Sequence, residues 1–178
     1  MIITKTNECT EWARRYQVQL DEQGRPVCCN NTTHRLRGGI STAFSKLLSL
    51  ARHLESLVYI DSQCLVWVTG WGIFGSAENL QLFYRYRQSY GNNLLLAAAP
   101  GHVCLSYERA EVATLVWLSM LQGWDVHVFS DIGSTSVFIS HDQWFEVGFT
   151  EFDACREKAE ELRNAKIDVE ITRYNEKL

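Results

Sequence analysis

Apolar residues recur at helical spacing in three stretches in the middle of the chain. Over 41–57 they fall three or four positions apart, which predicts an amphipathic helix. A second helix is expected over 76–89, with Ser76 as its N-cap. A third follows Ser106 and ends at Gly123. The inner face of the third helix is expected to consist of Ala110, Ala113, Thr114, Trp117, Leu118 and Leu121.

Shorter apolar runs between these helices predict strands. The run at 63–69 is continuous and rich in β-branched residues, as is typical of a buried strand. At least one strand is expected from the pair 94–98 and 103–105. Three further segments alternate apolar and polar residues and are separated only by short turns, which predicts an antiparallel meander over 124–129, 136–140 and 143–147.

A last helix is expected after Thr150, and the alternating tail at 167–173 is typical of an edge strand. Strand–helix alternation favours parallel pairing, whereas the meander adds antiparallel strands. The fold class is therefore predicted to be α/β, on the border of α+β. We expect a mixed sheet of about five strands with a C-terminal antiparallel meander, flanked by four main helices.

The first part of the chain is more polar and less periodic than the rest. A short helix is expected over 8–17, because Trp12 and Tyr16 would lie on one face of it. We interpret 1–178 as one globular domain, in which 1–37 is a less regular N-terminal attachment and 38–178 is the core.

Composition narrows the functional classes. Hydrophobic residues make up 46% of the chain, which excludes a mainly disordered protein. The net charge of −4 and the pI of about 5.7 make nucleic-acid binding an unfavoured function. The sequence shows no run of ~20 apolar residues and no signal peptide, so we expect a cytoplasmic protein that does not enter a membrane. No metal or cofactor motif is present, and none is expected to bind.

The glycine-rich segment Gly70-x-Gly72-x-x-Gly75 lies between a predicted strand and a predicted helix. Backbone N–H groups in that context can bind phosphate. Bulky residues separate these glycines, however, and no Lys-Ser or Lys-Thr follows them. We favour a loop in which glycine provides conformational freedom while Trp71 and Phe74 contact a neighbour.

Two other segments combine charge with aromatic rings. In the first, Arg85 and Arg87 alternate with tyrosines and would bind phosphate or carboxylate groups, or would cover the edge of the core with their apolar stems. In a helix these two arginines point in different directions and do not form one patch. Nucleic-acid binding through Arg35, Arg37, Arg85 and Arg87 is a second, unfavoured alternative.

The second segment holds the richest group of titratable side chains. In a strand, Asp142, Trp144 and Glu146 would share one face, and His141 would serve as a base at the strand end. His102, in a loop after Pro100-Gly101, is a further candidate for acid–base chemistry. The alternative is a solvated strand face with a polar turn.

We expect a non-catalytic module that binds a protein or another ligand, or that regulates a partner. Trp71, Phe74 and Trp144, with Arg85 and Arg87, are its predicted binding residues, and the partner is another protein or a second copy of the chain. The alternative is a hydrolytic or metal-assisted enzyme. It would use His102, His141, Asp142 and Glu146 and requires that these side chains meet in one pocket.

Overall fold

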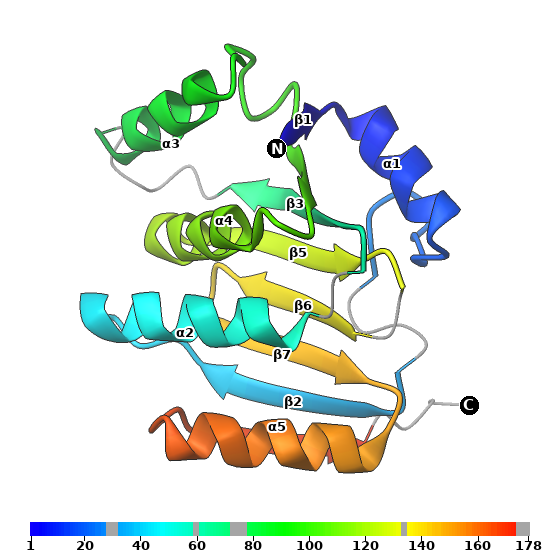
Figure 1. The fold of residues 1–178 in the computed structure, drawn as a ribbon, viewed down its shortest axis with the longest axis vertical. Coiled ribbons are helices and arrows are strands. Elements are labelled where there is room, and N and C mark those ends of the chain that lie inside the picture. Colours follow the sequence, from blue (N-terminus) through cyan, green and yellow to red (C-terminus); the bar gives the residue numbers. More distant parts are fainter. Residues whose placement is uncertain (28–31, 59–60, 72–77, 133–134, 174–178) are drawn as a thin grey trace.

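A computed structural model describes residues 1–27, 32–58, 61–71, 78–132 and 135–173. In these residues eight strands form one sheet, and five helices lie against it (Figure 1). The strands are β1 (Ile2–Thr4), β2 (His34–Gly39), β3 (Gln63–Trp71), β4 (Gly101–Leu105), β5 (Trp124–Ser130), β6 (Thr135–Ser140), β7 (Trp144–Phe149) and β8 (Val169–Arg173). The helices are α1 (Thr6–Arg15), α2 (Phe44–Leu57), α3 (Glu78–Ser89), α4 (Arg109–Gln122) and α5 (Phe152–Asn164).

The sheet is larger than the sequence predicts, and it is antiparallel throughout. Its strand order is β1-β4-β3-β5-β6-β7-β2-β8, and every hydrogen-bonded pair of strands is antiparallel. The prediction of a mixed sheet of about five strands is therefore wrong, although the α/β class is confirmed.

The error has a topological cause. Strands β4 and β5, joined by α4, do run parallel, but the antiparallel strand β3 lies between them. In the same way β2 lies between the parallel strands β7 and β8, which α5 joins. Helical crossovers favour parallel strands, but they do not require those strands to be neighbours.

The structure confirms the meander of β5, β6 and β7 and the edge strand at the end of the chain. Of the two expected short strands, 103–105 belongs to β4, whereas 94–98 is not a strand and includes a turn at 96–98. Ser76 lies outside the described residues. The division of the chain at residue 37 stays a prediction, but β1 and β2 pair with strands from the later part of the chain. No helix in the described ranges is long and apolar enough to cross a membrane.

The inner face of α4 differs from the prediction. The buried side chains are Val112, Leu115, Val116, Leu118, Ser119 and Met120. Only Leu118 belongs to the predicted set, and Trp117 is half-buried. Because α4 carries apolar residues on nearly all sides, spacing alone could not select the inward face.

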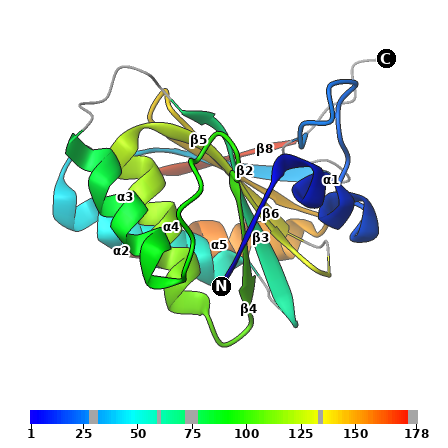
Figure 2. The same cartoon turned by 90° about the horizontal axis from the view of Figure 1, so that it is seen from above.

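Four helices cover one face of the sheet. Helices α2, α3, α4 and α5 pack on the side that Leu36, Val66, Val128 and Val147 face, and together they form the larger core (Figure 2). We call this side the helix face and the other side the opposite face.

Helix α1 covers part of the opposite face. Its buried side chains, Cys9, Trp12 and Ala13, pack with Leu65, Trp67, Val103 and Phe129 in a second core. The ring centroids of Trp12 and Tyr16 lie 4.5 Å apart, as the sequence predicts for one helical face. Farther along the opposite face, β6, β7 and β2 present a mixture of charged and aromatic side chains, which includes Phe138, Trp144 and Arg37.

We predict that Gly101→Ala weakens the attachment of the N-terminal segment. A Cβ at Gly101 would collide with the side chains of Cys9 and Thr4, and the Cys9 side chain is completely buried. Overpacking of this kind costs about 1–3 kcal/mol of unfolding free energy, measured by chemical denaturation. Gly39→Ala is the matched control, because a Cβ at Gly39 meets no atom within 4 Å. Equal stabilities of the two variants would contradict the close packing of α1 and β1 against β4.

Candidate functional site

The antiparallel strand order brings several distant segments to one end of the sheet. At this end β3, β6 and β2 finish, and β5, β7 and β8 begin. We call this end the rim. Its polar and aromatic side chains are those of Thr69, Trp71, Asp125, His141, Asp142, Trp144, Arg37, Asp168 and Glu170.

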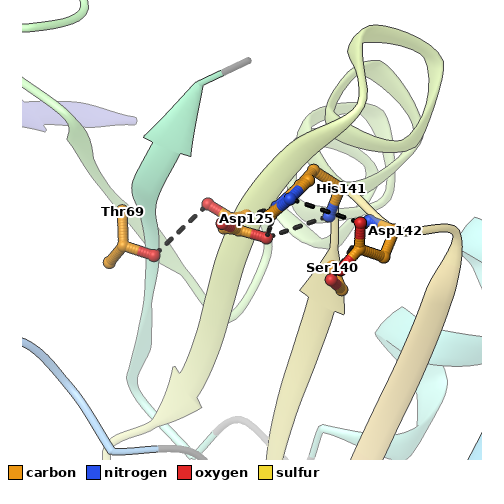
Figure 3. Close-up of polar contacts among 5 residues, drawn as sticks. All are labelled: Thr69, Asp125, Ser140, His141 and Asp142. Atoms are coloured by element: carbon orange, nitrogen blue, oxygen red, sulfur yellow. Dashed lines mark hydrogen bonds and ion pairs between the residues drawn. The ribbon is translucent and has the colours of Figure 1, made fainter.

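His141 and Asp125 form the best-defined polar contact of the rim (Figure 3). The Nδ1 atom of His141 lies 2.8 Å and 3.0 Å from the two carboxylate oxygens of Asp125. The backbone N–H of His141 donates to the same carboxylate at 2.9 Å. On the other side of the ring, Nε2 lies 3.4 Å from Oδ1 of Asp142. The imidazole is therefore held between two carboxylates.

Local backbone structure places Asp125. Strand β3 contains a register shift between Val68 and Gly70, and Gly70 faces Asp125 across the pair. A Cβ at Gly70 would lie 2.5 Å from Oδ2 of Asp125, so only glycine leaves room for the carboxylate here. The hydroxyl of Thr69 donates to the backbone carbonyl of Asp125 at 3.4 Å.

The carboxylates favour the protonated form of His141. Its pKa is raised, first by the hydrogen bond with Asp125 and then by the negative charges of Asp125 and Asp142. The side chain is 55% exposed, so solvent screens these interactions. A histidine can take up and release protons, but in His141 the side of Nε2 is already occupied by Asp142.

Within the described residues, the rim shows neither a nucleophile paired with His141 nor a metal site, which a hydrolytic enzyme would need. The hydroxyl of Ser140, the residue before His141, accepts the backbone N–H of Asp142 at 3.2 Å and shows no hydrogen bond with His141. No group of three or more His, Cys, Asp or Glu side chains that could hold a metal ion occurs in the described ranges.

A second feature of the rim is an arginine stacked on a tryptophan. The guanidinium carbon of Arg37 lies 4.0 Å from the ring centroid of Trp144, and the ring of Phe138 meets Trp144 edge-on at 5.2 Å. Next to this stack an open groove of about 390 Å³ lies between the end of β2 and the start of β8. Its lining residues are Arg37, Gly38, Gly39, Trp144, Asp168, Val169 and Glu170.

The structure does not bring the four proposed catalytic residues together. His102 is completely buried on the helix face of β4, and its Nδ1 lies 3.4 Å from the carbonyl of Val66. Two strands separate β4 from β6, which places the backbone of His102 about 14 Å or more from that of His141. The required single pocket of His102, His141, Asp142 and Glu146 is therefore not formed.

Glu146 also lies apart from His141. It shares the opposite face with Trp144, as predicted, but its carboxylate forms an ion pair with Arg35 at 3.0 Å. Asp142 lies in the turn before β7 and is not part of the strand. The polar turn that contains His141 and Asp142 is thus separate from the polar strand face that contains Glu146.

The predicted binding residues also lie at separate places in the structure. Trp71 is 39% exposed at the end of β3, where it faces Trp124 across the strand pair. Trp144 is half-buried, and Trp124 is buried against Phe83. Phe74 lies outside the described residues.

The four arginines do not form one surface. Arg85 is exposed on α3, but Arg87 of the same helix is completely buried, and both lie on the helix face of the molecule. Arg35 and Arg37 lie on the opposite face. The expectation that Arg85 and Arg87 point in different directions agrees with this arrangement.

Sequence reasoning missed Asp125, which orients His141. The alternation of Trp124 to Phe129 already puts Asp125 on the same strand face as His127. Pairing β5 and β6 as a hairpin would have placed Asp125 opposite Ser140, beside the turn that contains His141.

The chain matches no protein-family model, no curated protein and no solved structure with which it was compared. Its function therefore has to be argued from the geometry of the rim.

We predict that His141 titrates above the ordinary histidine pKa of about 6.5, whereas His102 and His127 titrate below it. NMR should show His141 titrating above this value in the wild type and closer to it in Asp125→Asn. His102 and His127 should stay neutral to much lower pH, because burial lowers their pKa to about 3.

The sign of the effect on stability follows from these directions. The contribution of the His141–Asp125 contact is complete below pH ~6.5 and is lost as the pH rises through the raised pKa of His141. Thermal denaturation should therefore separate wild type and Asp125→Asn more at pH 6 than at pH 9. The same separation at both pH values, with an unshifted His141, would show that the contact does not form in solution.

Proposed function

We propose that the protein is a non-catalytic binding module and that the rim binds a basic segment of a partner protein. The observation that carries the proposal is the Arg37–Trp144 stack beside an open groove with exposed carboxylates. Tryptophan and arginine are enriched at the residues that dominate protein interfaces.

The charge of the rim favours a cationic partner. Four carboxylates lie at this end of the sheet, those of Asp125, Asp142, Asp168 and Glu170. The groups that can carry a positive charge beside them are the guanidinium of Arg37 and the imidazole of His141. Asp142 is more exposed than Asp125 and His141, with 70% of its side chain accessible. A Lys or Arg side chain of a partner in the groove would approach Asp168 and Glu170, which increases the rate and specificity of association.

Trp71, also at the rim, is not part of this surface, because it faces Trp124, whose side chain packs on the helix face, whereas Arg37 and Trp144 lie on the opposite face. Trp71 is one of the exposed large apolar side chains, and its chain neighbour Gly70 packs against Asp125.

An enzyme remains the second candidate, because of the hydrogen bond between His141 and Asp125. A carboxylate that holds one nitrogen of a histidine orients the other nitrogen for proton transfer. The position of Asp142 beside Nε2 and the high exposure of His141 make this function less favoured.

Selection of peptides from a displayed random library tests the proposed function. The immobilised wild-type protein should enrich peptides with several Lys or Arg residues next to an apolar residue. Binding of the enriched peptides should fall at least about tenfold in Trp144→Ser, and it should weaken as salt rises because the carboxylates contribute. A double variant, Asp168→Asn with Glu170→Gln, should remove most of the salt dependence.

Tyr107→Ser is the matched control, because Tyr107 is 80% exposed and follows β4 at the other end of the sheet. Its peptide affinity should equal that of the wild type. Enrichment of acidic peptides, or equal binding by Trp144→Ser and Tyr107→Ser, would refute the rim as the binding surface. Catalytic turnover of a model ester that disappears in His141→Ala would favour the enzyme instead.

A further inference from the structure

Arg87 is a buried cation without a described counter-charge. It lies in the last turn of α3 and has no exposed surface. Its Nη2 donates to Oδ1 of Asn92 at 3.3 Å, a long hydrogen bond with a neutral amide. Its Nε and Nη1 have no hydrogen-bond partner, and no carboxylate in the described part of the chain forms an ion pair with it.

Arg87 lies against an aromatic ring that also contacts a second buried polar side chain. The guanidinium carbon lies 5.3 Å from the ring centroid of Phe83, and the ring of Phe83 lies 5.7 Å from that of His102. His102 is itself completely buried, and its Nε2 has no hydrogen-bond partner. Two buried polar side chains around one phenylalanine therefore have unused hydrogen-bonding capacity.

Electrostatics explain why an anion would be favoured there. Burial lowers the pKa of Arg87, and burial together with the positive charge of Arg87 lowers the pKa of His102 to about 3. The guanidinium stays protonated even so. The chain therefore holds a buried positive charge, and no described acidic group offsets the cost of its desolvation. An oxyanion would provide both the missing charge and acceptors for the free N–H groups.

Helix α3 buries fewer side chains than α4, so we expect an oxyanion to reach the guanidinium through local opening of this helix. Among its described side chains only Phe83 and Arg87 are buried, whereas α4 buries six. Segments with few buried contacts open locally more easily than the rest of a fold.

We propose that Arg87, together with His102 near the same phenylalanine ring, is the anchor of a binding site for a small oxyanion, such as a phosphate or a carboxylate group of a metabolite. The site lies under α3 on the helix face, and it is separate from the rim. Arg87 binds the oxyanion through Nε and Nη1. Neutral His102 donates from Nδ1 to the carbonyl of Val66, so its Nε2 accepts a hydrogen bond, for example from a protonated phosphate oxygen.

Thermal denaturation with inorganic phosphate tests the site, with chloride at equal ionic strength as the reference. Phosphate should raise the midpoint of the wild type by about 3–5 °C when it reaches ~10 times its dissociation constant. Arg87→Met should remove this shift and should be at least as stable as the wild type in chloride, because it replaces an unpaired buried charge with an apolar side chain. Malonate in a parallel series shows whether the site prefers a carboxylate to a phosphate.

Arg85→Met is the matched control, since Arg85 is exposed on the same helix two residues away. It should keep the full phosphate shift. If Arg87→Met fails to fold, an ¹⁵N NMR titration of the wild type replaces it, and phosphate should then shift the Nε–H signal of Arg87 and the amide signals around Asn92. Absence of a shift specific to phosphate or malonate, a shift retained in Arg87→Met, or a shift lost in Arg85→Met would overturn the proposal.

Discussion

The hydrogen-bonded register between β2 and β7 is the interaction on which the proposed function depends. It joins a strand from residues 34–39 to one from residues 144–149 and sets Arg37 opposite Glu146 and Gly39 opposite Trp144. A shift of this register by one residue would turn Arg37 to the helix face and Leu36 away from the core. Burial of Leu36 against Val147 on the helix face therefore fixes the position of Arg37 over Trp144 on the opposite face.

The same antiparallel order gives the two ends of the sheet different chemistry. At the rim, chain segments that are far apart in sequence contribute Asp125, the His141–Asp142 turn and the groove beside Trp144. At the other end the carboxylate of Asp131 accepts backbone N–H groups of Ser62 and Gln63, at 2.7 Å and 2.9 Å. The Ser62 hydroxyl donates to the same carboxylate, and against the opposing effect of burial this bond, followed by the backbone bonds, lowers the pKa of Asp131. Together they tie the start of β3 to the end of β5, which is a structural role.

Local patterns in the sequence predicted the elements better than their arrangement. The alternation around Val126 and Val128 placed β5 correctly, and helical spacing located α2 to within three residues at its start. His34 to Gly39 was not recognised as a strand, because its two arginines and two glycines carry little β-propensity and its pairing with β7 and β8 stabilises it instead.

For the site, local sequence was informative only where the partners are close in the chain. The sequence singled out His141, Asp142 and Trp144, which one turn connects. It could not place His102, because that position depends on strand order, nor could it show that Arg87 is buried without an acidic partner. Pairing between strands that are distant in the sequence decides which titratable groups meet. The hydrophobic periodicity of a single sequence does not reveal that pairing.

Cross-strand nuclear Overhauser effects test the β2–β7 register most directly. In an antiparallel pair, Hα atoms of facing residues come close at every second position. The account predicts Hα–Hα cross-peaks at alternate facing pairs, which include either Arg37–Glu146 or Leu36–Val147. Cross-peaks displaced by one residue, or their absence between these two strands, would contradict the register and with it the proposed binding surface.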